Sequence, residues 1–161
     1  MGRMYTAQFN AVSISGTSQD LFEIAAPADA VVVIHDWNIF QTSDVGDAAE
    51  EILRLECVRG VGTVTSGSGG STVTPQAVSD GDPAFGGTVE ANNTTRMAAG
   101  TGSLETLPQH GWNVRSEYQK IYTPETRPVI SPGNRWTLSL PAAPADALTT
   151  SGTVTFEEIG G

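Results

Sequence analysis

Residues 134–161 read NRWTLSLPAAPADALTTSGTVTFEEIGG, and this stretch decides the fold class. In its first part, Trp136, Leu138 and Leu140 alternate with polar residues, which is the period of a strand with one apolar and one polar face. The same alternation predicts a second strand over Thr153–Ile159, and the proline and glycine residues between the two strands exclude a helix. Because the edges of such strands need partners from earlier in the chain, the sequence predicts a β-domain closed by its own C-terminal end.

The composition also favours strands and turns. The 161 residues suit one domain over residues 1–161, and only 16% of them are charged, too few for the surface of a helical bundle. Glycine (18 residues) and proline (9 residues) are abundant, as in chains built from strands and tight turns. We therefore expect a single all-β domain.

The charge and the cysteine content restrict the partners. With a net charge of −10 the surface repels phosphate backbones, so we expect no nucleic-acid partner. No apolar stretch approaches the ~20 residues of a membrane-spanning helix, and the N-terminal residues lack the apolar run of a signal peptide. We expect no membrane partner and synthesis in a cytoplasm. Cys57 is the single cysteine, which excludes an internal disulfide, and its place in an apolar register predicts a core residue.

Turn residues divide the chain into about eight or nine short strands, the pattern of an antiparallel β-sandwich of jelly-roll type. The expected strands cover residues 4–14, 20–25, 31–41, 50–59, 88–97, 112–122, 128–131, 135–140 and 153–159. A change in alternation near Asn10 and Ala11 predicts a β-bulge in the first strand. Over Asp47–Val58 a helix competes with the strand because AAEEILRLE has high helix propensity, and the unbroken alternation favours the strand.

Apolar positions in these registers predict the hydrophobic core. The expected core residues are Phe9, Phe22, Ile24, Val33, Trp37, Ile39, Leu53, Leu55, Val114, Trp136, Leu138, Leu140, Val154 and Phe156. The run Val31–Ile34 is apolar throughout and predicts a strand that is covered on both faces. Trp112, Tyr118 and Tyr122 share one register in the strand expected over residues 112–122.

Gly60–Asp82 predicts one long Gly/Ser-rich surface loop, with room for one strand at Thr72–Ala77. Within it, GSGGST at Gly67–Thr72 has the glycine content of a phosphate-binding loop. It lacks the lysine that would reach the phosphates and the strand-to-helix context, so the flexible-loop interpretation is better.

The residues that could perform chemistry are few. There is no GxSxG elbow, HExxH helix or paired CxxC, so the sequence predicts no enzyme and no cofactor. His35 falls in the most apolar strand, as a hydrogen-bonded core or interface residue, whereas His110 falls in a glycine-flanked loop exposed to solvent. The carboxylates between Asp44 and Glu51, which include Asp47 and Glu50, are either a cation site without EF-hand spacing or a solvated acidic loop.

Several longer segments resemble a family of small virion proteins of tailed bacteriophages. The segments are DLFEIAAPADAVVVIH (20–35), QTSDVGDAAEEILRL (41–55), GSGGSTVTPQ (67–76), VEANNTT (89–95) and LPAAPADALTTSGTVTFEEIGG (140–161). The resemblance implies a jelly-roll decoration or cement protein that is made in the host bacterial cytoplasm and sits as a homotrimer on the outer capsid of the virion. The implied partners are the major capsid protein and the chain itself, and the family has no catalytic residues to transfer.

Two functions remain open on these grounds. One is a cement protein that binds the shell and stabilises it against genome pressure, and the other is a receptor- or glycan-binding module of a tail or fibre. A glycan site needs exposed tryptophan or tyrosine on loops. Because Trp37, Trp112 and Trp136 all fit strand registers, the structural function is favoured.

Two segments could reach across capsid subunits. The first is an N-terminal arm, residues 1–10, with Arg3 beside the apolar Met4 and Tyr5. The second is the long loop over residues 60–82, which can order against a partner at an entropic cost. The residues in it that we single out as capsid contacts are Gly67, Gly69 and Gly70.

Overall fold

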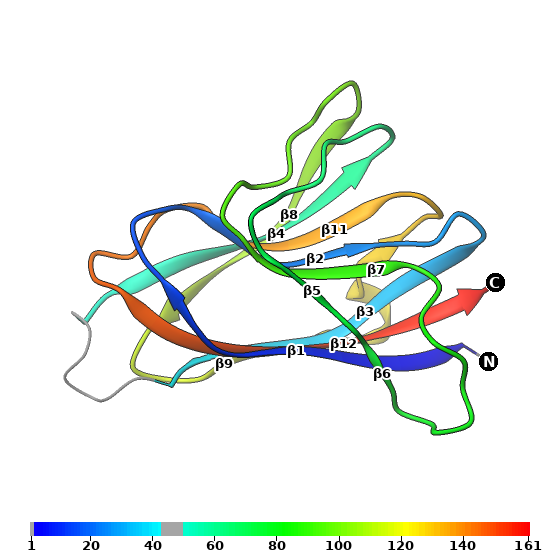
Figure 1. The fold of residues 1–161 in the computed structure, drawn as a ribbon, viewed down its shortest axis with the longest axis horizontal. Coiled ribbons are helices and arrows are strands. Elements are labelled where there is room, and N and C mark those ends of the chain that lie inside the picture. The colour runs from blue at the N-terminus through cyan, green and yellow to red at the C-terminus, as the bar shows by residue number, and fades with distance from the viewer. Residues whose placement is uncertain (1, 43–49) are drawn as a thin grey trace.

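The computed structural model describes residues 2–42 and 50–161, which form two antiparallel β-sheets packed face to face (Figure 1). The strands are β1 (Arg3–Ile14), β2 (Gln19–Ala25), β3 (Ala30–Gln41), β4 (Ile52–Val61), β5 (Ser71–Val73), β6 (Gln76–Ala77), β7 (Thr88–Asn93), β8 (Ser103–Asn113), β9 (Tyr118–Ile121), β10 (Val129–Ile130), β11 (Arg135–Leu140) and β12 (Leu148–Gly160). A single turn of 3₁₀ helix, η1 (Pro124–Thr126), joins β9 to β10. The all-β sandwich expected from the sequence is confirmed.

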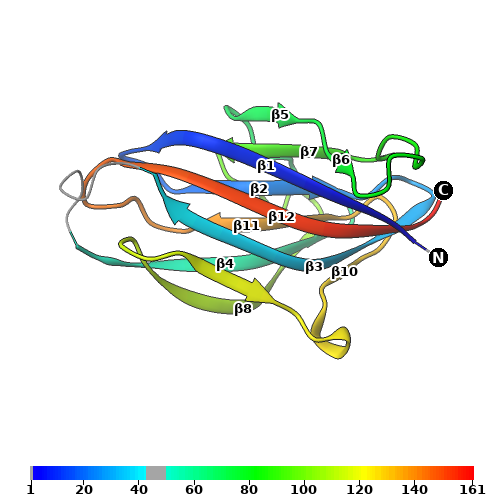
Figure 2. The same ribbon diagram turned by 90° about the horizontal axis from the view of Figure 1, so that it is seen from below.

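The C-terminal stretch occupies the centre of both sheets. One sheet, here called sheet A, has the order β10-β3-β12-β1-β6, with β9 also paired to β3. The other, sheet B, has the order β5-β7-β2-β11-β4-β8. Strand β11 lies between β2 and β4, and β12 lies between β3 and β1, so each sheet is completed only when the end of the chain is in place (Figure 2).

The predicted bulge is present in β1. The register of β1 against β12 shifts between Phe9 and Val12, and Ala11 takes a positive φ of 51°. The side chain of Ser151 accepts a hydrogen bond of 2.9 Å from the Ala11 backbone nitrogen, which satisfies a donor that the bulge removes from the ladder.

The core between the sheets matches the expected one with a single exception. Every predicted core residue is buried except Val33, which is half-buried. Val33 lies opposite Glu157 of β12 and Val129 of β10, on the outer face of sheet A. The interpretation of Val31–Ile34 as covered on both faces is therefore wrong, because only Val32 and Ile34 point into the core.

Two further segments differ from expectation. The strand expected over residues 112–122 is two strands in different sheets, since β8 pairs with β4 and β9 pairs with β3. Residues 104–111, which lie outside the strands expected from the sequence, belong to β8. Pro108 is compatible with that strand because β8 is the edge of sheet B. The described part of the chain holds twelve strands, three more than the highest number expected, and β5, β6 and β10 are only two or three residues long.

Candidate interaction surface

The N-terminal segment is a strand inside sheet A. Residues 3–9 pair with β12 on one side, and Tyr5 and Thr6 pair with β6 on the other. Tyr5 is fully buried, donates a 2.9 Å hydrogen bond to the Pro83 carbonyl and stacks against Phe156. The interpretation of residues 1–10 as an N-terminal arm is corrected for residues 3–9, whose alternating apolar side chains make them part of the core ladder.

Arg3 and Met4 lie at the start of this strand, beside the end of the chain. Arg3 donates hydrogen bonds of 2.7 Å and 3.2 Å to the carbonyls of Gly160 and Gly161, and the Met4 carbonyl accepts one of 2.8 Å from the Val78 nitrogen. A depression of about 340 Å³ opens here. Its lining residues are Gly2, Arg3, Met4, Val78, Ser79 and Asp82.

The glycine-rich segment is held against sheet B. Gly67 is buried, and a Cβ on it would lie 2.7 Å from Nδ2 of Asn93. Gly69 has a φ of +85°, a left-handed conformation that glycine adopts without strain, and a Cβ on Gly70 would collide with the Ala91 carbonyl oxygen. These glycines permit close approach to β7, so the long surface loop expected over residues 60–82 is held against the sheet, and the strand expected at Thr72–Ala77 is present as two short strands. The segment includes β5 and β6, and it pairs with both sheets.

Glu23 of β2 fixes this segment in place. Its buried carboxylate accepts hydrogen bonds of 2.8 Å from the Gly67 nitrogen, 2.7 Å from the Ser66 hydroxyl and 3.2 Å from Asn93. Arg135 completes the set with an ion pair of 2.8 Å. Four donors thus compensate the charge of the Glu23 carboxylate, which lies beneath the glycine-rich segment.

Asp20, in the same strand, holds the segment that precedes β8. It accepts a hydrogen bond of 2.7 Å from the Met97 nitrogen and one of 3.4 Å from Arg96, and Ser139 also donates to it. Burial nevertheless raises the pKa of the Asp20 carboxyl, against the lowering effects of Ser139, Met97 and Arg96. Asp20 and Glu23 were not predicted as structural residues. The available signal was two carboxylates inside the short apolar strand DLFEIA.

A groove of about 420 Å³ separates β1 from the glycine-rich segment. Phe9, Val12 and Val73 contribute apolar lining, and Gly69 and Gly70 form part of its rim. Within it the buried Gln19 donates a 3.1 Å hydrogen bond to the Asn92 side chain. Asn92 itself has a φ of 59°, a conformation that asparagine tolerates better than most residues.

The six residues singled out from the sequence therefore divide into three groups. Arg3 and Met4 line the first depression, and Gly69 and Gly70 line the groove. Tyr5 and Gly67 are buried and cannot contact a partner in the folded chain. The pairing of β6 with β1 places the first depression and the groove along one side of the sandwich. We call this side the β1 surface, lined by Gly2, Arg3, Met4, Gln8, Gly69 and Gly70 among others.

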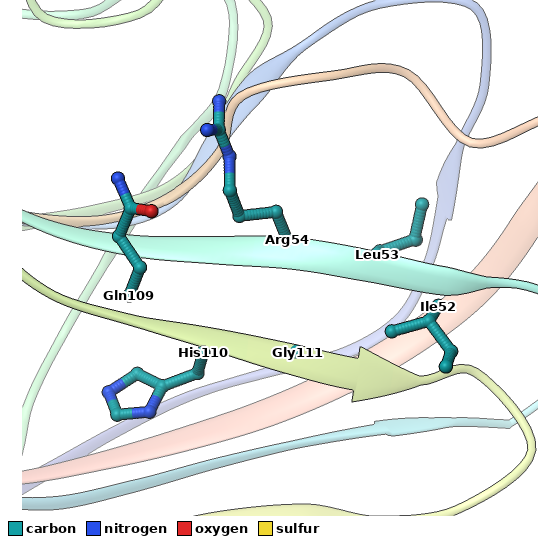
Figure 3. A pocket seen from close by; sticks show the side chains of 6 residues that line it. All are labelled: Ile52, Leu53, Arg54, Gln109, His110 and Gly111. Carbon is teal, nitrogen blue, oxygen red and sulfur yellow. The ribbon is translucent and has the colours of Figure 1, made fainter.

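A third depression, of about 320 Å³, lies over β4 and β8 (Figure 3). In it Arg54 and Gln109 point to one side of the strand pair and His110 points to the other. The Nδ1 atom of His110 is 2.9 Å from the Tyr118 hydroxyl, and its ring packs edge-on against Trp37. The expectation of a solvated loop histidine is wrong, because His110 lies in strand β8 and is half-buried against Tyr118 and Trp37. This burial, and to a lesser degree the charge of Lys120, lowers the pKa of His110.

The remaining polar candidates have structural partners. His35 is hydrogen-bonded to Glu157 at 3.0 Å, as expected for a core or interface histidine. Glu51 accepts hydrogen bonds of 3.0 Å and 3.2 Å from the Ala145 nitrogen, while Asp44 and Asp47 lie outside the described residues. Over residues 2–42 and 50–161, there is no group of three or more His, Cys, Asp or Glu side chains that could hold a metal ion. No helix in these same ranges has the length and apolarity to cross a bilayer.

Comparisons with known proteins add little to this description. No protein-family model matches the chain. No curated protein matches it either. Among solved structures, it is similar to the infectious bursal disease virus VP2 subviral particle, with 18% identity over 99% of this chain and 42% of that chain. It is also similar to the T13 IBDV viral particle, with 16% identity over 99% of this chain and 40% of that one. The TM-score is 0.17 in both cases, too low to establish a common fold, and the chain spans about two fifths of the length of those proteins.

Proposed function

We propose that this protein is a structural bacteriophage virion protein, a capsid decoration protein that binds the outer shell as a homotrimer. The observation on which the proposal rests is the β1 surface. Two segments far apart in the sequence, 2–13 and 69–82, are joined by the pairing of β6 with β1 and line two depressions, of about 340 Å³ and about 420 Å³. Its partner is the major capsid protein.

The strand order supports a sandwich of jelly-roll type. Strands β1, β12 and β3 are neighbours in one sheet, and β2, β11, β4 and β8 are neighbours in the other. Along the chain, β1 and β2 lie in opposite sheets, as do β3 and β4, and β11 and β12. Such alternation is what two interleaved Greek keys produce.

A preformed surface suits a protein that stabilises a shell. The β6–β1 ladder and the Glu23 hydrogen bonds order the contact segments before binding, so little conformational entropy is lost on docking. The net charge of −10 attracts basic patches on the capsid protein, and the contact weakens as salt screens that attraction. The alternative of a glycan-binding tail module lacks a stacking platform at the tryptophans, because Trp37, Trp112 and Trp136 are fully buried.

The test is a particle-stability experiment. Particles that lack the protein should release their genome at a lower temperature than complete ones, and the purified protein should restore them. Val78→Glu, at a side chain 64% exposed in the first depression, should weaken restoration. Ile52→Glu, at a side chain 75% exposed on β4, is the matched control and should restore fully. Wild-type protein that neither binds nor stabilises the particles would overturn the proposal.

A further inference from the structure

One edge of strand β1 is only partly used by the chain itself. Strand β6 pairs with β1 at Tyr5 and Thr6, and the Met4 carbonyl accepts the next hydrogen bond of this ladder from the Val78 nitrogen. Figure 2 shows β6 beside the N-terminal part of β1. Over the described residues, no backbone hydrogen bond joins residues 7–14 to a segment other than β12. The edge of β1 is therefore open beyond Thr6.

The backbone groups on this open edge have a defined direction. In a strand, the N–H and C=O groups of every second residue point to the same side. Because the Met4 carbonyl points towards β6, the backbone groups of Thr6, Gln8 and Asn10 point to that side as well. Thr6 is paired with Gln76 there. Gln8 and Asn10 thus present unpaired donors and acceptors as far as the bulge, which is what an added strand needs.

The groove of about 420 Å³ lies along this same edge. Its lining residues from β1 are Gln8, Phe9, Val12 and Ser13, so it begins two residues after the last pair with β6. The opposite wall comes from β5 and β7, and β5 is the edge strand of sheet B. The groove therefore runs between an edge of each sheet.

The lining of the groove is uncharged. None of the residues that line it is an acid, a base or a histidine. Phe9, Val12, Val73 and Ala91 supply apolar side chains that belong to the core or pack against it. An occupant without charge and with apolar groups on one side fits such a lining.

A pair of amide side chains adds a second polar feature. Nε2 of the buried Gln19 donates to the Asn92 side chain at 3.1 Å, whereas Gln19 Oε1 and Asn92 Nδ2 make no hydrogen bond with any described residue. One free acceptor beside one free donor can satisfy the N–H and C=O of a peptide backbone. Asn92 and Ala11, the two non-glycine residues with positive φ in the described chain, both lie at or beside this groove.

We propose that the groove takes an extended polypeptide segment of the capsid protein, which adds a strand to the open edge of β1. The segment continues the line of β6, pairs with the backbone of Gln8 and Asn10, and packs every second side chain against the apolar lining. Six residues at ~3.3 Å each are about 20 Å long, which spans the groove from Gln8 to Ser13. That the segment belongs to the capsid protein rests on the proposed function, and its extended form deepens that function by naming what the partner inserts.

The long edge of the other sheet is protected against such pairing. Strand β8 is the edge of sheet B, and Pro108 in its middle removes a donor from any new ladder. Residues 7–10 of β1 contain neither proline nor a charged side chain. A strand therefore adds more readily at β1.

A neutral oligosaccharide is the other ligand that an uncharged groove with amide side chains could hold. It makes no use of a strand edge, and Phe9, which is only 7% exposed, presents little ring surface to a sugar. The unpaired backbone of β1 favours the polypeptide.

The first measurement is amide hydrogen exchange in the free protein, followed by NMR. The Gln8 amide should exchange at least about tenfold faster than the Thr6 amide, because β6 covers Thr6 and no described segment covers Gln8. A Gln8 amide as protected as that of Thr6 would show that the edge is already paired and would overturn the inference.

The second measurement is the affinity for synthetic peptides of about 15 residues that together cover the major capsid protein, each long enough for a six-residue strand with flanks. At least one peptide should bind the wild type. Gln8→Pro removes the N–H from the edge and should weaken binding at least about tenfold. Gln8→Ala removes the same side chain but keeps the N–H, so as the matched control it should retain more of the affinity than Gln8→Pro by about that factor.

A second pair of variants tests the lining. Val73→Glu places a carboxylate in the groove and should weaken peptide binding at least about tenfold. Val129→Glu introduces the same side chain on β10, at the opposite edge of sheet A, and should bind as the wild type does. Circular dichroism and thermal unfolding establish that each variant is folded. If Gln8→Pro does not fold, Val73→Glu and the slowing of Gln8 amide exchange by the bound peptide decide the outcome.

The outcomes separate this inference from the proposed function. If no peptide binds, or if folded Gln8→Pro and Val73→Glu bind as their controls do, the inference is overturned, even where the wild type stabilises particles. Binding of maltohexaose or chitohexaose that Val73→Glu weakens, with Gln8→Pro and Gln8→Ala alike, would assign the groove to a sugar and also overturn it. A peptide that binds as expected, with wild-type protein that neither binds nor stabilises particles, would support the inference and defeat the proposed function.

Discussion

The backbone nitrogen of Gly67 donates a 2.8 Å hydrogen bond to the carboxylate of Glu23, a residue 44 positions earlier in the chain. This bond joins the glycine-rich segment to the middle of sheet B, and it forms only because the segment approaches the strands closely. The glycine is required by that approach. A Cβ at position 67 would lie 2.7 Å from Nδ2 of Asn93 and 2.8 Å from the Thr95 carbonyl oxygen.

Gly67→Ala should therefore destabilise the fold. The Thr95 carbonyl belongs to the backbone and cannot turn away, so the segment must shift and the Glu23 hydrogen bonds must lengthen. We expect a loss of about 1–3 kcal/mol in the free energy of unfolding, measured by urea denaturation. Gly81→Ala is the control, because a Cβ there meets nothing within 4 Å. Equal effects of the two substitutions would show that close approach is not the reason for Gly67.

Leu138→Ala tests the register of the C-terminal stretch. Leu138 is fully buried in β11, between Phe22 of β2 and Cys57 of β4. Its truncation should cost ~2–5 kcal/mol in the free energy of unfolding, because the neighbouring strands cannot close the cavity. Leu104→Ala, at a leucine 40% exposed on the edge strand β8, should cost less than ~1 kcal/mol by the same measurement. A small effect at Leu138 would contradict the packing described here.

The fold was predictable where a local pattern decided the structure. The alternation over residues 135–140 and 153–159 correctly predicted two strands, because burial of one face has a period of two whatever the partner strand is. The shift of parity near Ala11 correctly predicted a bulge for the same reason. Val33 was wrongly assigned to the core, because a continuous run of apolar residues does not show which of its side chains face inward. Only the pairing of Val33 with β10 and β12 shows which face it lies on.

The candidate surface was predictable only in part, because it depends on contacts between distant residues. The sequence indicated residues 1–10 and 60–82 but not that they pair with each other through β6. Glycine-rich sequence indicates flexibility and close approach equally well, and the distinction needs the position of Glu23. The burial of Asp20 and Glu23 likewise follows from covering segments that lie more than 40 residues further along the chain.

Asp20 should give the unfolding free energy a pH dependence of unusual sign. Its pKa in the folded protein is raised above the ordinary 3.8, so the folded state holds this proton more tightly than the unfolded state does. The stability that protonated Asp20 contributes is present below pH 3.8 and is lost as the pH rises through the raised pKa. Most paired carboxylates, with lowered pKa values, act in the opposite direction.

Asp20→Asn isolates this effect, because asparagine keeps an acceptor for the Met97 nitrogen and cannot ionise. Urea denaturation of both proteins from about pH 3.5 to about pH 7 gives the difference in unfolding free energy, wild type minus variant. The difference should fall as the pH rises through the window above 3.8. Were it to rise instead, the charges of Arg96 and the donor of Ser139 would outweigh burial, and the pKa of Asp20 would be lowered.

Cys57 should be unreactive in the folded protein. Burial raises the pKa of its thiol to about 11, and its sulfur lies 3.3 Å from the Tyr122 hydroxyl inside the sandwich. Reagents attack the thiolate, which is scarce at pH 8 for such a group and is also out of reach. Iodoacetamide at pH 8 should therefore label the native protein only through its small unfolded population, whereas the chain in concentrated urea, with an ordinary thiol pKa of about 8.5, should be labelled rapidly. The labelling rate of Leu138→Ala should exceed that of the wild type by the factor by which its unfolded population increases. Rapid labelling of the native wild type, with no difference between the two proteins, would place Cys57 at the surface and contradict the assignment of β4 to the centre of the sandwich.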